Sequence, residues 1–127
     1  MSKTTLYDVH ADGKAHVIIA GRFEGGTPPL YPIANPPGWT VARTSSGIYT
    51  ITFADQYAAF ISCVVSLEAT VESTADGWTV MTSTYTDGAN PTLVVTTNPE
   101  TGTTVGDLPA ATFINFIAVF RNTTVAQ

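Results

Sequence analysis

The feature that most constrains the fold of this chain is a short-range alternation of apolar and polar residues. In the stretch IYTITF (48–53), Tyr49, Ile51 and Phe53 lie on one side of an extended strand and threonines lie on the other. Similar segments recur between turn residues along the chain, and helical periodicity is hard to find. The pattern predicts an all-β protein, an antiparallel β-sandwich or jelly-roll-like fold of seven to nine short strands.

The expected strands follow directly from this alternation. In the C-terminal two thirds of the chain they are WTVART (39–44), IYTITF (48–53), AFISCVVSLEATVE (59–72), WTVMTSTY (78–85), TLVVTT (92–97) and ATFINFIAVFRNT (111–123). Threonine occurs 22 times and is well suited to half-exposed sheet surfaces because it is β-branched.

The N-terminal third has a different character. Residues 4–24 are expected to form a β-hairpin, since Asp12-Gly13 matches the tight turns that join such strands. Residues 25–39 contain five of the eight prolines, which excludes a central strand or a helix there. We therefore divide the chain into a hairpin with a proline-rich extended arm, residues 1–38, and a β-sandwich domain, residues 39–127.

Two strands are apolar to a degree that a simple two-layer sandwich does not require. In the last strand one face is expected to carry Phe113, Asn115, Ile117 and Val119, and the other Ile114, Phe116, Ala118 and Phe120. In the strand from residue 59, Ile61, Cys63, Val65 and Leu67 are expected in the core, and Phe60, Ser62, Val64 and Ser66 on a mixed outer face. A strand that is apolar on both faces needs a second cover, either the proline-rich segment or another subunit.

Charge and composition exclude several partners. The formal charge is −5 at pH 7, with ten acidic and five basic residues, which argues against binding to nucleic acid or to an anionic membrane surface. The N-terminal sequence lacks the apolar stretch of a signal peptide, and no apolar run approaches the length of a membrane helix. The single cysteine, Cys63, excludes an intrachain disulfide, and we expect the chain to fold in a reducing cytoplasm.

Candidates for chemistry are few, and each has a structural alternative. Asp8, His10 and Asp12 would share one face of a strand, with His16 across the turn, as divalent-metal ligands or simply as exposed polar residues. Cys63 is either a nucleophile or, without a nearby histidine, a buried structural thiol.

The carboxylates and the glycine-rich stretches add little to this set. The acids Asp55, Glu68, Glu72 and Asp76 fall at turns and strand ends. Neither a GxSxG nucleophile elbow nor a phosphate-binding loop is present. We therefore expect no enzyme activity, no cofactor and no metal.

Aromatic and arginine side chains leave two further questions open. The aromatic residues Trp39, Trp78, Tyr49, Tyr57 and Tyr85 either line a sugar-binding face or pack in the core or an interface. Arg43 and Arg121 either pair with acids across a subunit contact or are plain surface residues.

The segment 38–69 and the C-terminal strand together resemble a known family. The residues that carry the resemblance are Gly47, Tyr49, Ile51, Phe53, Tyr57 and Phe60, followed by Ile114 to Asn122. This pattern, which covers roughly residues 38–122, is similar to that of small virion proteins of tailed bacteriophages. The resemblance implies a β-sandwich that forms a homotrimer and decorates, or cements, the outer capsid at local three-fold positions, without enzyme activity or cofactor.

A specific hypothesis follows for such a capsid decoration protein. Its partners would be further copies of itself and the major capsid protein, and it would be made in the host cytoplasm and end on the capsid surface. The subunit interface would contain Phe113, Phe116, Ile117, Phe120 and Arg121, and a shell-contacting arm would contain Pro28, Pro29, Leu30, Tyr31 and Pro32. Deletion of residues 1–38 is then expected to leave a folded trimer that no longer binds shells. The alternative function is a tail or fibre tip knob that binds a host surface carbohydrate through exposed tryptophans or tyrosines.

Overall fold

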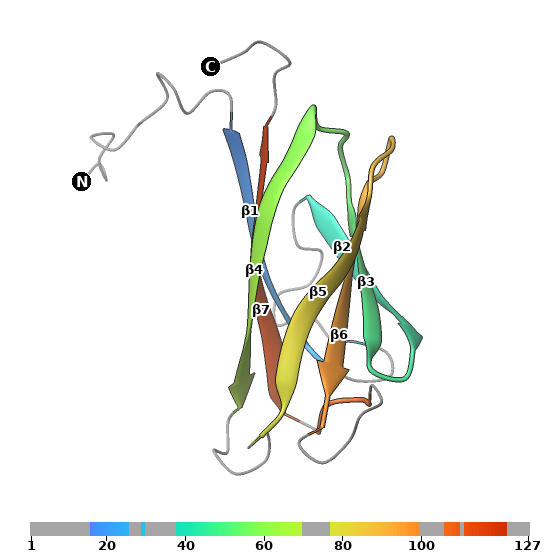
Figure 1. The fold of residues 1–127 in the computed structure, drawn as a ribbon, viewed down its shortest axis with the longest axis vertical. Helices are drawn as coiled ribbons and strands as arrows, with labels where there is room; N and C mark the ends of the chain where they lie inside the picture. The colour runs from blue at the N-terminus through green and yellow to red at the C-terminus, as the bar shows by residue number, and fades with distance from the viewer. Residues whose placement is uncertain are drawn as a thin grey trace, which may run out of the picture.

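The computed structural model describes residues 16–25, 29, 38–69, 77–99, 106–109 and 111–121. Two antiparallel sheets pack face to face in this part of the chain, and it contains no helix (Figure 1). The strands are β1 (His16–Glu24), β2 (Trp39–Ser45), β3 (Ile48–Phe53), β4 (Ala59–Ala69), β5 (Thr79–Thr86), β6 (Thr92–Asn98) and β7 (Thr112–Arg121). The predicted all-β sandwich is confirmed.

The order of the strands makes β1 part of the sandwich, as an edge strand of one sheet. One sheet has the order β1-β7-β4 and the other β2-β3-β6-β5, and all neighbouring strands are antiparallel. β1 pairs with β7 over nine residues, from His16 opposite Arg121 to Glu24 opposite Phe113. The sandwich therefore includes residues on both sides of the boundary expected at residue 38. The first strand of the expected hairpin, residues 4–10, lies outside the described residues.

The core lies between the sheets and is rich in aromatic side chains. Phe116 of β7 meets Trp39 of β2 edge-on, with ring centroids 5.0 Å apart, and Phe53 at 6.4 Å. Phe120 packs edge-on against Phe53, with ring centroids 4.9 Å apart. Burial of these large rings is the main stabilising contribution that this fold offers, because each removes a large apolar area from water.

Gly21 of β1 shows how closely the two sheets approach. A Cβ atom built on this residue would lie only 2.6 Å from the indole of Trp39 and would also collide with the ring of Phe116. The missing side chain gives both rings room over the strand, so the glycine is required here by close packing and not by a turn.

A β-bulge in β4 corrects one expectation about its faces. The pairing with β7 shifts between Phe60 and Ser62, so one extra residue is inserted into β4. Phe60 consequently faces the core and stacks on Tyr85 with ring centroids 4.4 Å apart, whereas Ile61 turns outward. The assignment of Ile61 to the core and of Phe60 to the outer face was wrong, because strict alternation does not hold across a bulge. Cys63, Val65 and Leu67 pack against the core as expected.

Candidate functional site

The most unusual surface of the described residues is the outer face of the β1-β7-β4 sheet. Five large hydrophobic side chains are exposed in this part of the chain, and four of them lie here: Ile18 (68% exposed), Val64 (66%), Ile117 (50%) and Ile61 (47%). They come from all three strands of the sheet.

The strand register places these side chains side by side. Ile117 on the central strand lies between Ala20 and Val64, and the next outward residue, Val119, lies between Ile18 and Ser62. Such cross-strand neighbours are in contact range. We call these residues the aliphatic face: Ile18, Ala20, Ile61, Val64, Ile117 and Val119.

A polar cluster borders one end of the aliphatic face. Arg22 of β1 reaches across the central strand to Glu68 of β4, with Nε–Oε1 and Nη2–Oε2 distances of 3.0 Å. Its guanidinium lies 3.9 Å from the centroid of the Phe113 ring, and the Asn115 amide donates to the same carboxylate. Arg22, together with the Asn115 amide, holds the pKa of Glu68 below its ordinary value. The cluster ties the three strands together and covers Phe113, so the apolar surface ends here.

The outer face of the other sheet has a different composition. Outward positions of β2, β3, β6 and β5 are mostly threonine, including Thr40, Thr44, Thr50, Thr52, Thr79, Thr84, Thr86, Thr92 and Thr96. Met81 is the one strongly exposed large hydrophobic residue described there. This threonine face presents hydroxyl groups to water while keeping β-branched packing within the sheet.

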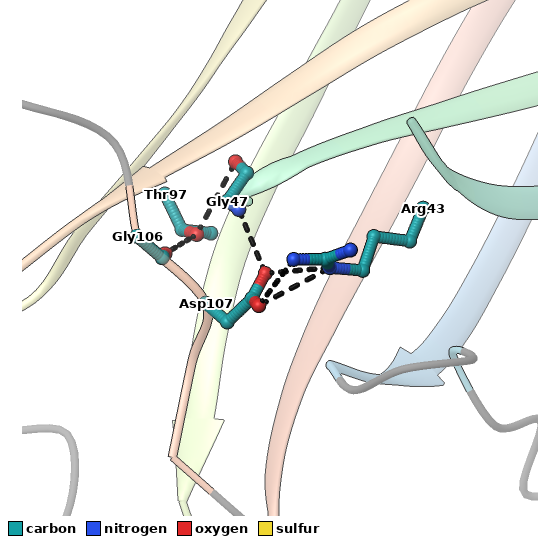
Figure 2. Close-up of polar contacts among 5 residues, drawn as sticks. All are labelled: Arg43, Gly47, Thr97, Gly106 and Asp107. Carbon is teal, nitrogen blue, oxygen red and sulfur yellow. Dashed lines mark hydrogen bonds and ion pairs between the residues drawn. The ribbon is translucent and has the colours of Figure 1, made fainter. Parts of the chain in front are cut away.

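A polar clasp fixes the segment 106–109 against the β2–β3 turn (Figure 2). The guanidinium of Arg43 makes a two-pronged contact with the Asp107 carboxylate, with an Nη2–Oδ2 distance of 2.8 Å and an Nε–Oδ1 distance of 3.0 Å. The same carboxylate accepts a hydrogen bond of 2.7 Å from the Gly47 amide. Gly47 has a φ of 70°, which favours glycine at this turn.

The clasp continues to β6 through Thr97. The buried Thr97 hydroxyl donates to the Gly106 carbonyl at 2.7 Å, and the Gly106 amide donates back to the Thr97 carbonyl at 3.0 Å. Arg43 thus pairs with an acid of its own chain, which is neither of the two alternatives that the sequence left open for this residue. Arg43, then burial and the Gly47 amide, act on the Asp107 carboxyl, and the net effect lowers its pKa. The arrangement holds a loop in place and leaves no free acid–base pair.

Of the remaining candidates for chemistry, Cys63 and His16 fall within the described residues. Burial raises the pKa of the Cys63 thiol to about 11, so the thiol stays protonated at neutral pH and is a poor nucleophile. His16 is exposed on β1. Asp8, His10 and Asp12 lie outside the described residues. Among those that the structure does describe, no group of three histidine, cysteine or acidic residues is arranged to hold a metal ion.

Most of the aromatic residues proposed for sugar binding are part of the core. Trp39, Tyr49 and Tyr57 are buried, and Tyr57 stacks on Phe120 with ring centroids 4.5 Å apart. Tyr85 is half-buried under Phe60, and only Trp78 remains partly exposed without such stacking. The structure therefore forms no exposed aromatic platform from these five residues.

The residues expected at a subunit interface separate onto two faces of β7. Phe116 and Phe120 are 2% and 0% exposed in the core of the sandwich, so neither side chain is available to a partner. Phe113, Ile117 and Arg121 project from the opposite, outer face. Of the expected shell-contacting arm, Pro29 is buried, while Pro28, Leu30, Tyr31 and Pro32 lie outside the described residues.

Sequence reasoning found half of the aliphatic face. It placed Ile117 and Val119 on one face of the last strand and Val64 on the outer face of its own strand. It assigned Ile18 and Ala20 to a separate hairpin and Ile61 to the core. The register joins residues about a hundred positions apart in the chain for β1 on β7 and about fifty apart for β4 on β7, and no local pattern reports such pairing. The one available signal was the doubly apolar strand at 113–120, which indicated that something had to cover a second face.

Comparisons with known proteins add no assignment: no protein family, curated protein or solved structure matches this chain. Within the described ranges, no helix is long and apolar enough to cross a membrane.

Proposed function

We propose that this protein is a structural component of a bacteriophage virion, a capsid decoration (cement) protein that associates with further copies of itself and with the major capsid protein. It would be made in the host cytoplasm and would stabilise the head shell from outside. The observation that carries this proposal is the aliphatic face, which the residues that the structure describes leave largely exposed. An exposed apolar surface of this kind is characteristic of proteins that work in an assembly.

The polar groups of the described residues support the same proposal. Arg43, Asp107, Arg22 and Glu68 are all engaged in contacts that brace the sandwich, and the Cys63 thiol is held in its protonated form. A protein that reinforces a shell needs a braced scaffold and an adhesive surface, and it needs no reactive group. A sugar-binding tip has less support, because the aromatic residues that it would use are mostly buried.

The residues that resemble phage virion proteins have identifiable roles in the scaffold. Tyr49, Ile51 and Phe53 fill the core, Gly47 makes the turn before them, and Tyr57 stacks on Phe120. The resemblance therefore bears on the shared sandwich. The homotrimer that the resemblance implies is untested, and the mass measurement described below distinguishes it from a dimer.

Binding to capsids tests the proposal. Heads of the phage that encodes the chain would be prepared without the protein and mixed with increasing amounts of it, and bound protein would be measured after sedimentation. Saturable binding to expanded heads, with a rise in the temperature at which they release DNA, is expected. Failure of the folded, self-associated protein to sediment with expanded heads would overturn a decoration role.

A further inference from the structure

The aliphatic face has the regular arrangement of a sheet surface that docks against another sheet. It spans two successive rows of outward side chains across all three strands, Ile18–Val119–Ser62 and Ala20–Ile117–Val64, with Ile61 beside them at the bulge. These rows lie next to each other in the sheet, between the row of His16 and Arg121 at one end and the Arg22–Glu68 cluster at the other. Sheets with such faces pack on one another about 10 Å apart in β-sandwiches.

We propose that the occupant of this face is the same face of a second copy of the chain, with the strands of the two copies antiparallel. The first reason is charge. The chain as a whole carries −5, which opposes close approach of two copies. Outward charges on this sheet, however, are Arg22, Glu24, Glu68 and Arg121, which sum to zero. Two copies can therefore meet here without bringing net like charge together.

The second reason is how these charges are distributed along the strands. Arg22 neutralises Glu68, so Glu24 leaves a negative charge at one end of the sheet. Arg121 gives a positive charge at the opposite end, because β7 runs antiparallel to β1 and pairs Arg121 with His16. A two-fold axis across the strands brings the positive end of each copy to the negative end of the other.

That two-fold arrangement also fits the aliphatic side chains. With Arg121 of each copy opposite Glu24 of the other, the two Ala20–Ile117–Val64 rows overlap in the middle of the contact. The Ile18–Val119–Ser62 row of each copy then lies opposite the Arg22–Asn115–Ser66 row of the other. The contact is self-complementary, as in most homodimers. Copies arranged in parallel around a three-fold axis would instead bring like-charged ends together. The inference does not depend on a virion role.

The test is the mass of the full chain in solution, measured by light scattering after size-exclusion chromatography over a wide concentration range. The wild-type protein is expected to have twice the 13.4-kDa mass of one chain. Val64→Asp and Ile18→Asp, on the two edge strands, place a charge in the apolar contact and are expected to give single chains. Met81→Asp is the matched control, because Met81 is also more than half exposed (56%) but lies on the opposite sheet.

Circular dichroism and thermal unfolding would show that each variant is folded. Since the substituted side chains are exposed, each variant is expected to keep the β-sheet spectrum. A wild-type mass of one chain or of three chains would overturn the proposal. So would a two-chain mass that survives in both Val64→Asp and Ile18→Asp, or one that Met81→Asp disrupts equally. Two independent positions keep the test valid if one variant does not fold.

Discussion

The two outer faces of the sandwich both belong to antiparallel sheets, one of three strands and one of four, and they differ in surface chemistry. On the β2-β3-β6-β5 sheet the outward positions are mainly threonine, and on the β1-β7-β4 sheet they are isoleucine, valine and alanine around Ile117. Threonine, isoleucine and valine are all β-branched, so the residues that dominate each face favour the strand conformation equally. The difference therefore has no explanation in strand formation, and it indicates that the aliphatic face is adapted to contact and the threonine face to water.

The largest effect is expected from removing the strand that completes the aliphatic face. Deletion of residues 1–38 takes away β1, and with it Ile19 and Phe23 of the core and the whole of one edge of β7. The remaining chain is expected to lose cooperative unfolding, measured by circular dichroism during heating. This replaces the expectation from the sequence that the deletion leaves a folded trimer.

A shorter deletion serves as the control for that experiment. A chain that starts at His16 keeps every described strand and is expected to unfold cooperatively. If the chain without residues 1–38 also unfolds cooperatively, β1 is dispensable and the aliphatic face is not an integral part of the sandwich.

The next largest loss of stability is expected on the inner face of β7, and the outer face of the same strand gives the comparison. Phe116→Ala leaves a cavity between Trp39 and Phe53 and is expected to lower the free energy of unfolding by about 3–5 kcal/mol. Ile117→Thr, one residue further and half exposed, is expected to change the stability of the single chain by no more than about 0.5 kcal/mol. Urea denaturation at low protein concentration measures both, and equal losses would contradict the assignment of inner and outer faces.

The sequence predicted the inside of this molecule better than its outside. Alternation in β3 correctly indicated which of its residues are buried, because a core imposes a period of two on a strand. In β7 it separated the two faces correctly but did not identify the buried one, and Phe116 and Phe120 were expected at a subunit interface. It failed in β4, where a bulge breaks that period, and it separated β1 from the sandwich, because the pairing of β1 with β7 is long-range. The aliphatic face depends on both features.

The clasp between Arg43 and Asp107 was equally hidden from the sequence. The two residues are 64 positions apart, and Asp107 comes from a stretch that reads as an ordinary loop. What the sequence did indicate is that β7 carries more apolar surface than one core can bury. That excess was visible because it lies within a single strand. The partners of Ile117 lie on β1 and β4, far away in the sequence, and could not be identified in the same way.

Replacing the exposed aliphatic residues by threonine is expected to have a smaller effect on the unfolding temperature, and one that depends on protein concentration. In a chain with Ile18→Thr, Val64→Thr and Ile117→Thr, the aliphatic face takes on the chemistry of the threonine face. Self-association stabilises a folded protein by mass action, so the unfolding temperature of the wild type is expected to rise with protein concentration. The triple variant is expected to show no such rise in differential scanning calorimetry. An identical concentration dependence in both proteins would mean that another surface mediates association.

The smallest effect on stability is expected from removing one of the two ion pairs, Arg43–Asp107 or Arg22–Glu68. Asp107 has a pKa below its ordinary value of 3.8 in the folded chain, chiefly because of the hydrogen bonds from Arg43. A depressed carboxyl pKa stabilises the folded state at pH values above 3.8, and this contribution is lost as the pH falls from there through the folded-state pKa. Asp107→Asn is therefore expected to lower the unfolding temperature at neutral pH and to reduce its decline in acid.

Glu68→Gln is the matched change on the β1-β7-β4 sheet. Comparing its effect on stability with that of Asp107→Asn shows how much a carboxylate that also holds a loop contributes beyond its ion pair. Glu68 also has a lowered pKa, mainly because of Arg22, so the sign of its pH dependence is the same. Asp107 additionally accepts the Gly47 amide and fixes the 106–109 segment, whereas Glu68 joins side chains on strands that are already paired. Asp107→Asn is accordingly expected to cost more stability than Glu68→Gln in thermal unfolding between neutral and acidic pH. Equal losses would mean that the contact of Asp107 with the β2–β3 turn adds nothing to the ion pair.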